Sequence, residues 1–399
     1  SNGEIIITGG TVTINNEVIS QCTGNPSKTA VIITADTNFD INNTVKVGTG
    51  GQLSITQLIG DIMLDPTSIG NLDCSGFNIT AQSGSISTND TADINAGTKD
   101  ITLIASDTFL NGGKNLLTTG FVSLTDSDGQ FDITQDMINA FGNGDLYLIS
   151  GNGDMIFGED LATGSRNIKL FSSGDILADG NSLTIAASQE VDMLTNKNID
   201  IILKGQGSII AQGKSINLAY TDTNQLNIQS LNVPMIPGGS GDVTVTSTGD
   251  LRIVDISSYN NISITSDGAV DIISTINAEK NILISSKDDV TNNGEITATG
   301  NLTLSADTDN IGGGKLQING NVKGAIVTLN LGNEGAGINA NVTSTANNLI
   351  VNGLGDLTIS DTQADTIAVS KLISSKLTFD NHSAGHSNFF HSSQDIDAI

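Results

Sequence analysis

A 20-residue repeat constrains the fold of this chain more than any other feature of its sequence. Five asparagines share one phase, and an aliphatic residue follows each of them; they are Asn261, Asn281, Asn301, Asn321 and Asn341. A second aliphatic row recurs two residues later, at Ile264, Ile284 and Leu304. Internal periods of roughly 20 to 50 residues are typical of solenoids, propellers and arrays. Because one such repeat is too short for a propeller blade or a pair of helices, the period predicts a stack of β-coils.

The residues inside each repeat alternate between polar and aliphatic. The phrases "NISIT", "NILIS" and "NLTLS" place an apolar side chain at every second position, which is the period of a strand with one buried face. The predicted fold class is therefore all-β, a parallel β-helix with coils of about 20 residues in which like side chains stack on like. One coil buries too few aliphatic side chains to offset its own ordering entropy, so each coil depends on its neighbours.

The five phased asparagines are predicted to have a structural role. An asparagine at a fixed turn position can hydrogen-bond to the asparagine of the next coil and so form a ladder. The alternative is an array that matches a repetitive ligand such as ice or a glycan. Threonine does not keep the same phase, which favours the structural ladder.

The regularity of the repeat divides the chain. The predicted parts are irregular amino-terminal coils or a cap over residues 1–50, the β-helix over 51–376, its most regular stretch over 257–345, a loop or break at 220–241, and a cap or tail over 377–399. The loop at 220–241 contains Pro234 and Pro237, which interrupt strands. One short helix is predicted over 133–144, with Thr134 as its N-cap and Gly142 as its stop.

The charge balance disfavours nucleic acid as a partner. The chain has 43 acidic residues against 16 basic ones, for a formal net charge of −27, and its only arginines are Arg166 and Arg252. Nucleic-acid binding needs basic patches, so it is disfavoured. The acidic residues are scattered, which indicates a solvated surface. No apolar run is long enough for a transmembrane helix. We expect the protein to be a monomer.

The two cysteines, Cys22 and Cys74, leave two interpretations open. They could form a disulfide if the protein is exported, or they could be two small buried apolar side chains. The first residues, "SNGEIIITGG", carry no basic segment followed by an apolar one. We therefore expect either a chain whose leader has been removed or a fragment of a longer protein.

Several phrases resemble the repeats of a known family. They are "GEITATGNLTLSADT" at 294–308, "DITQDMINAFGNGDLYLISGNGDMIFGEDL" at 132–161 and "NSLTIAASQEVDM" at 181–193. These resemble filamentous-haemagglutinin-like adhesins, large exoproteins of Gram-negative bacteria that are exported by two-partner or autotransporter routes. The resemblance implies a right-handed parallel β-helix, a secreted or cell-surface location and a virulence role in adhesion or competition.

The same resemblance implies partners and also has limits. The implied partners are an outer-membrane translocator during export and a receptor or glycan on host cells or other bacteria. The family's amino-terminal secretion signature with Asn-Pro-Asn motifs is not visible here, and the chain ends in "DIDAI" without a set of barrel strands. Both departures favour an internal passenger fragment.

Residues that could carry catalysis or bind metal are few and isolated. Asp288 and Asp289 form the nearest approach to a paired-carboxylate site, but neighbours on a strand point to opposite faces, so we expect a solvated turn beside Lys287. Arg166 and Arg252 stand alone, and no catalytic role is predicted for either. The remaining candidates are a calcium turn around Asp307 and Asp309, and a metal site from His382, His386 and His391. No ligand count supports either site, so the sequence predicts no catalytic residue, metal or cofactor.

These observations lead to one function and two alternatives. The leading hypothesis is a non-enzymatic adhesin passenger, a rod-like β-helical shaft that presents binding loops such as 220–241, or one face, to host cells or bacteria. A glycan-active β-helix enzyme, either a polysaccharide lyase or a hydrolase, would need a groove with at least two clustered carboxylates. The third hypothesis is the delivery-stick segment of a contact-dependent toxin.

Overall fold

The computed structural model describes a set of segments in which every regular element is a β-strand. The described residues are 4–16, 18–20, 29–41, 45–47, 52–64, 76–88, 94–97, 100–105, 107–109, 116–118, 122–127, 131–133, 145–158, 161–162, 167–178, 184–186, 190–204, 207–235, 241–311, 313–332, 337–340, 348–354, 357–361, 366–373, 377–381 and 389–392. These described segments contain no helix, and so none that could cross a bilayer. The chain forms two compact units, Ser1–Lys197 and Asn198–Ile399.

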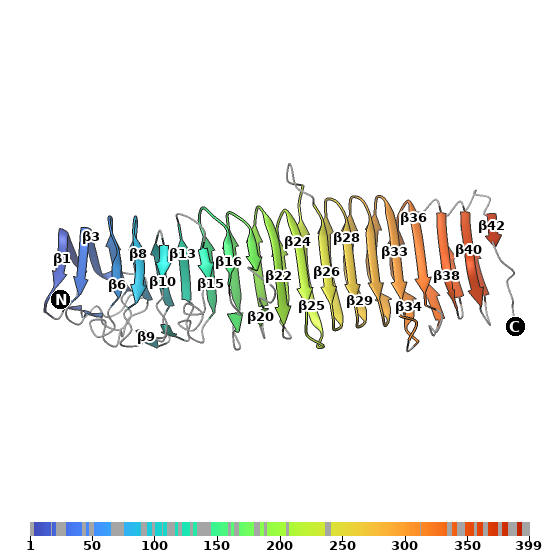
Figure 1. Cartoon of the computed structure of the whole chain (residues 1–399), viewed down its shortest axis with the longest axis horizontal. Helices are drawn as coiled ribbons and strands as arrows, with labels where there is room; N and C mark the ends of the chain where they lie inside the picture. Colours follow the sequence, from blue (N-terminus) through green and yellow to red (C-terminus); the bar gives the residue numbers. More distant parts are fainter. Residues whose placement is uncertain are drawn as a thin grey trace. The chain divides into compact units, whose positions relative to one another are not determined.

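In the first unit, one series of strands pairs coil upon coil. This series is β1 (Ile5–Ile14), β3 (Thr29–Ile41), β5 (Gln52–Gln57), β7 (Gly76–Ala81), β10 (Asp100–Ala105), β13 (Val122–Asp126), β15 (Leu146–Ser150), β18 (Ile168–Ser172) and β21 (Glu190–Thr195). The other strands are β2 (Val18–Ser20), β4 (Val45–Val47), β6 (Ile62–Leu64), β8 (Ser85–Thr88), β9 (Ile94–Gly97), β11 (Asp107–Phe109), β12 (Leu116–Thr118), β14 (Phe131–Ile133), β16 (Met155–Phe157), β17 (Leu161–Ala162), β19 (Ile176–Ala178) and β20 (Thr184–Ala186). Figure 1 shows these strands in blue to green.

In the second unit, two series of strands form two faces of the coils. The first face consists of β22 (Asn198–Lys204), β24 (Ser215–Tyr220), β26 (Val243–Ser247), β28 (Ile262–Ser266), β30 (Ile282–Ser286), β33 (Asn301–Ala306), β36 (Ile326–Leu331), β38 (Asn348–Leu354), β40 (Thr366–Ile373) and β42 (Phe389–Ser392). The second consists of β23 (Ser208–Gln212), β25 (Leu226–Val233), β27 (Leu251–Ser258), β29 (Val270–Ala278), β31 (Val290–Asn292), β32 (Glu295–Ala298), β34 (Lys315–Ile318), β35 (Asn321–Lys323), β37 (Gly337–Ala340), β39 (Leu357–Asp361) and β41 (Leu377–Asn381).

The pairing confirms the predicted all-β parallel β-helix. Each strand runs parallel to its equivalent one coil further on: Leu53 pairs with Phe77 in the first unit, and Ile262 pairs with Ile282 in the second. A coil contains about 22 residues, so the shorter period seen in the sequence holds only where the turns are shortest. Turn length varies freely because the turns lie outside the paired strands.

The core consists of aliphatic columns that run through the coils. Val245, Ile264, Ile284 and Leu304 pair in succession, and all four are 0% exposed. Each such side chain contributes roughly 1.5–3 kcal/mol through burial. The alternation of the strands directs the intervening polar residues outward.

The structure places strands in three of the predicted parts of the chain. Leu226–Val233, within the segment predicted as a loop or break at 220–241, is β25 and pairs with β27. Within residues 1–50, β1 and β3 already pair in parallel. At the other end, β41 and β42 pair with β39 and β40, so coils continue into the stretch predicted as a cap or tail. Of the predicted helix over 133–144, Ile133 ends β14 and the rest lies outside the described residues.

Candidate functional site: a polar face and the corners that hold it

Buried hydroxyl groups fix the corners where the strands of the first face end in the second unit. Ser266 is 1% exposed. Its Oγ donates to the carbonyl oxygen of Gly249 in the preceding coil over 2.8 Å and accepts the N–H of Gly268 over 3.2 Å. Ser286 repeats the arrangement, donating to Gly268 over 2.7 Å and accepting the N–H of Asp288 over 2.9 Å. Each corner is thereby tied to the coil before it.

Serine hydroxyls bond to the preceding coil in the same way in the first unit and at the opposite corner of the second unit. In the first unit, the Ser172 hydroxyl donates to the carbonyl of Gly153 over 2.9 Å and accepts the N–H of Gly174. Ser258 donates to the carbonyl of Gly241 in the second unit. Sequence reasoning missed these residues. A usable signal was present, because Ser-x-Gly at a strand end recurs at 172, 247 and 266.

An asparagine ladder follows one edge of the first face. The backbone N–H and Nδ2 of Asn281 donate to Oδ1 of Asn261 over 3.3 and 3.1 Å, and the N–H of Asn301 donates to Oδ1 of Asn281 over 2.9 Å. The ladder begins one coil earlier than predicted, since the N–H and Nδ2 of Asn261 donate to Oδ1 of Asp242 over 3.1 and 3.0 Å. These side chains join successive coils, which is a structural role.

Asn321 and Asn341 are the two predicted members that follow Asn301 in the sequence. Asn321 does not continue the ladder, which corrects the prediction: it lies in β35 and pairs with Glu295, whereas the residue that pairs with Asn301 is Ile326. The longer connection between β33 and β34 shifts this coil out of the phase of the sequence repeat. Asn341 lies outside the described residues.

Two of the carboxylates predicted as candidates accept backbone N–H groups. Oδ1 of Asp289 accepts the backbone N–H of Lys315 over 2.7 Å, and Oδ1 of Asp309 accepts that of Ile311 over 3.0 Å. Asp307 is fully buried, with a left-handed φ of 53°, and both of its carboxylate oxygens lack a hydrogen-bond partner. Among the described residues, no three His, Cys, Asp or Glu side chains gather into a group that could hold a metal ion.

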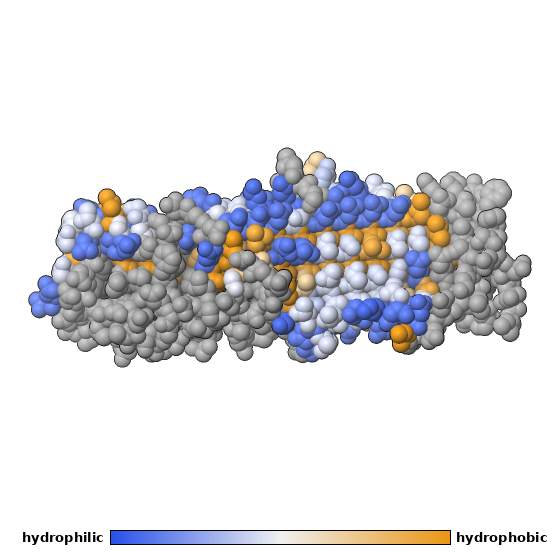
Figure 2. All heavy atoms as spheres, in the orientation of Figure 1, coloured by the Kyte–Doolittle hydropathy of each residue, from blue (hydrophilic) through white to orange (hydrophobic). Residues whose placement is uncertain are grey.

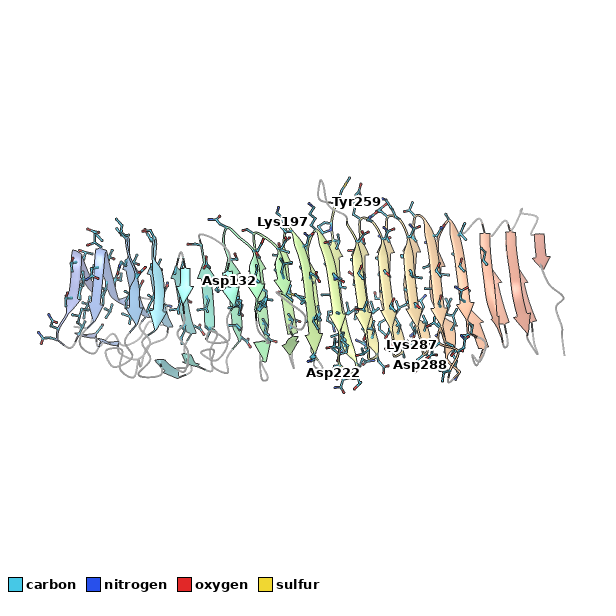
Figure 3. The ribbon with its side chains drawn as sticks, in the orientation of Figure 1. Asp132, Lys197, Asp222, Tyr259, Lys287 and Asp288 are labelled. Carbon is cyan, nitrogen blue, oxygen red and sulfur yellow. The ribbon has the colours of Figure 1, made fainter. Side chains whose placement is uncertain are left out.

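Lys287 and Asp288 lie at the lower edge of the second unit in Figure 3. The Lys287 ammonium is 2.7 Å from Oδ1 of Asp267. The hydrogen bond to Asp267 and the charge of that carboxylate raise the pKa of Lys287. This corner is therefore charged and solvated, as expected for the turn.

Charged side chains also mark the second face. Arg252 projects from β27 and pairs in register with Asp271 of β29. Burial raises the pKa of the Asp255 carboxyl, which follows a register shift in the pairing of β27 with β29. The ammonium of Lys323 lies 3.1 Å from Oε1 of Glu295. A hydrogen bond from Lys323, together with its charge, lowers the pKa of Glu295.

The first face contrasts with the second, because its outward positions from β26 to β36 carry no charge. Apart from Asn301 and Ile326, which begin β33 and β36, these positions are Thr244, Thr246, Ser263, Thr265, Leu283, Ser285, Thr303, Ser305, Thr328 and Asn330, of which only Ser305 is buried. They fall into two ranks, since Thr244 pairs with Ser263 and Thr246 pairs with Thr265, and the pairing continues through β30, β33 and β36. We call these ten residues the hydroxyl face; Figure 2 shows it as a pale band between hydrophilic edges.

The remaining predicted residues fall where the structure gives no side-chain position. Cys22, Cys74, Arg166, His382 and His386 lie outside the described residues. His391 lies in β42, where only the backbone is described.

No family model, curated protein or solved structure matches the chain.

Proposed function

We propose that this chain is a non-enzymatic passenger of a Gram-negative surface adhesin. In this role the β-solenoid is a shaft, displayed outside the outer membrane after passage through a translocator by a two-partner or autotransporter route. The shaft presents a binding surface to a receptor or glycan on host cells or other bacteria. The observation that carries the proposal is a parallel β-solenoid whose repeat phrases resemble filamentous-haemagglutinin-like adhesins.

The use of the acidic side chains supports a structural and display role. Asp242, Asp289 and Asp309 each accept backbone N–H groups in turns. An enzyme that cleaves glycans with two carboxylates needs both groups free and close together. The net charge of −27 also favours solubility and self-repulsion for a displayed protein.

A cell-binding assay tests the proposal. Fluorescently labelled chain is added to epithelial cells and to Gram-negative bacteria, and bound label is measured by flow cytometry. We expect saturable binding that unlabelled chain competes away. The matched control is the same chain after heat unfolding, which has the same composition and charge. Binding no greater than that of the unfolded control on every cell type contradicts an adhesive role.

A turnover screen separates the enzymatic alternative. The chain is incubated with neutral and acidic polysaccharides, and new reducing ends and unsaturated products are measured. We expect no product above the buffer control. Catalytic release of either product rejects the non-enzymatic assignment.

A further inference from the structure

We infer that the hydroxyl face binds a neutral polysaccharide that lies across the strands, along the direction in which the coils stack. This inference rests on the proposed adhesive function and names its class of ligand. It starts from the contrast between the two faces of the second unit. Ten side chains from five successive strands carry no charge, and all but Ser305 are at least partly exposed, in a chain with 43 acidic residues.

The spacing of the hydroxyl face suits a polymer. Adjacent coils are about 4.8 Å apart, and the two ranks, two residues apart on a strand, are about 6.6 Å apart. The five strands therefore offer a grid of side-chain hydroxyls about 19 Å long. A chain of pyranose units, each about as long as one coil step, meets a new pair of uncharged side chains with every unit.

The chemistry of the hydroxyl face fits sugars. A Ser or Thr hydroxyl donates one hydrogen bond and accepts others, as a sugar hydroxyl does. Thr246 and Thr265 are exposed. Leu283, in the centre of the grid, is 43% exposed, and it supplies an apolar contact for the C–H face of a sugar ring. The face therefore offers polar groups around one exposed apolar side chain.

Other ligand classes fit this face less well. Protein hot spots are enriched in Trp, Tyr and Arg, and none of these is among the ten residues. A nucleic acid or polyuronide needs cationic partners, and the acidic edge at Asp242 would repel it. Ice requires a flat surface, whereas Leu283 stands above the shorter Thr and Ser side chains. A neutral hydroxyl-rich polymer remains the best match.

Affinity electrophoresis tests the inference with the whole chain. Native gels are cast with dextran, mannan or galactomannan as neutral probes and with polygalacturonate as the acidic probe. We expect at least one neutral polysaccharide to retard the chain, and polygalacturonate not to do so. Failure of every neutral probe to retard the chain overturns the inference, as does retardation by the acidic probe alone.

Three variants locate the site. Thr265→Lys places a charge in the hydroxyl face, and Leu283→Ala removes its apolar centre. Asn277→Lys is the matched control, because Asn277 is exposed on β29 of the second face and the substitution changes the net charge equally. We expect the apparent affinity for the polysaccharide, taken from the retardation, to fall at least ten-fold in Thr265→Lys and three-fold or more in Leu283→Ala. The affinity of Asn277→Lys should not change. Equal binding by all three variants contradicts the inference.

The same variants separate this inference from the adhesive function. If Thr265→Lys still binds cells as wild type does, adhesion stands and the assigned face is wrong. If the wild type binds a neutral polysaccharide but no cell, the face stands and adhesion is wrong. Shaping of ice crystals without any polysaccharide binding identifies ice as the ligand and overturns the assignment.

Discussion

The buried hydroxyl at Ser266 provides the sharpest test of how the coils are held together. Ser266→Ala removes the acceptor for the N–H of Gly268. It also removes one of two hydroxyl groups that donate to the carbonyl of Gly249; the other is that of Ser247, at 2.7 Å. The carbonyl keeps a partner, whereas the partly buried N–H of Gly268 loses its acceptor. Leaving a buried donor unsatisfied costs about 1–3 kcal/mol. Because this N–H is only partly buried, we expect a loss at the low end of that range, about 1 kcal/mol in unfolding free energy.

The same strand offers a matched control. Ser263 lies on β28 three residues earlier and faces outward, so Ser263→Ala makes the same chemical change without burying an unpaired group. Its expected effect is within about 0.5 kcal/mol of wild type. Urea unfolding followed by far-ultraviolet circular dichroism measures both variants, and the shift of the midpoint at constant slope gives the change in stability.

Native-state hydrogen exchange then localises the effect. Protection of the Gly268 amide should fall in Ser266→Ala and stay at its wild-type value in Ser263→Ala, because only the first substitution removes its acceptor. Equal losses of stability in the two variants, or an unchanged Gly268 exchange rate in Ser266→Ala, would refute the claim that buried hydroxyls hold the corners.

Three further predictions concern other features of the second unit. Gly294→Ala should destabilise by about 3 kcal/mol or more, because an added Cβ overlaps the carbonyl oxygen of Ser274 in the preceding coil; a urea midpoint equal to that of wild type argues against this close approach. Asp255→Asn should stabilise the protein at pH 7, since burial raises the pKa of Asp255 and the folded state therefore favours its protonated form. The wild-type protein loses stability as the pH rises from the pKa of Asp255 in the unfolded state through its higher pKa in the folded state. The stability gained by Asp255→Asn should therefore vanish below both pKa values. A gain in thermal stability that stays constant across pH 3–7 contradicts burial of the charge as its cause. Lys287→Met should leave the urea midpoint at its wild-type value, because the bridge to Asp267 is solvent-exposed on both sides and solvent screens it; a lower midpoint that persists in high salt means that the contact is more than a screened surface pair.

The sequence alone determined the fold class. The short, constant spacing of Asn261, Asn281 and Asn301 leaves room only for short strands and turns, and strict alternation in "NISIT" or "NLTLS" requires one buried and one exposed face. Aliphatic columns such as the one through Ile264 and Ile284 follow directly from that register. The ladder contacts of the three asparagines follow as well, because an equal spacing along the chain gives each of them the same place in its coil.

Only the tertiary structure decided which residues share a coil position where the turns vary in length. Asn321 keeps the sequence phase but lies on another strand, because the connection after β33 is longer than those before it. The inward direction of Ser266 follows from the alternation only if the strand extends that far, and the structure shows that β28 ends at this residue. The hydroxyl face likewise became visible only when strands from residues 243 to 331 were brought side by side. Parallel pairing aligns residues by their place in the coil, and insertions between strands make that place differ from distance along the chain.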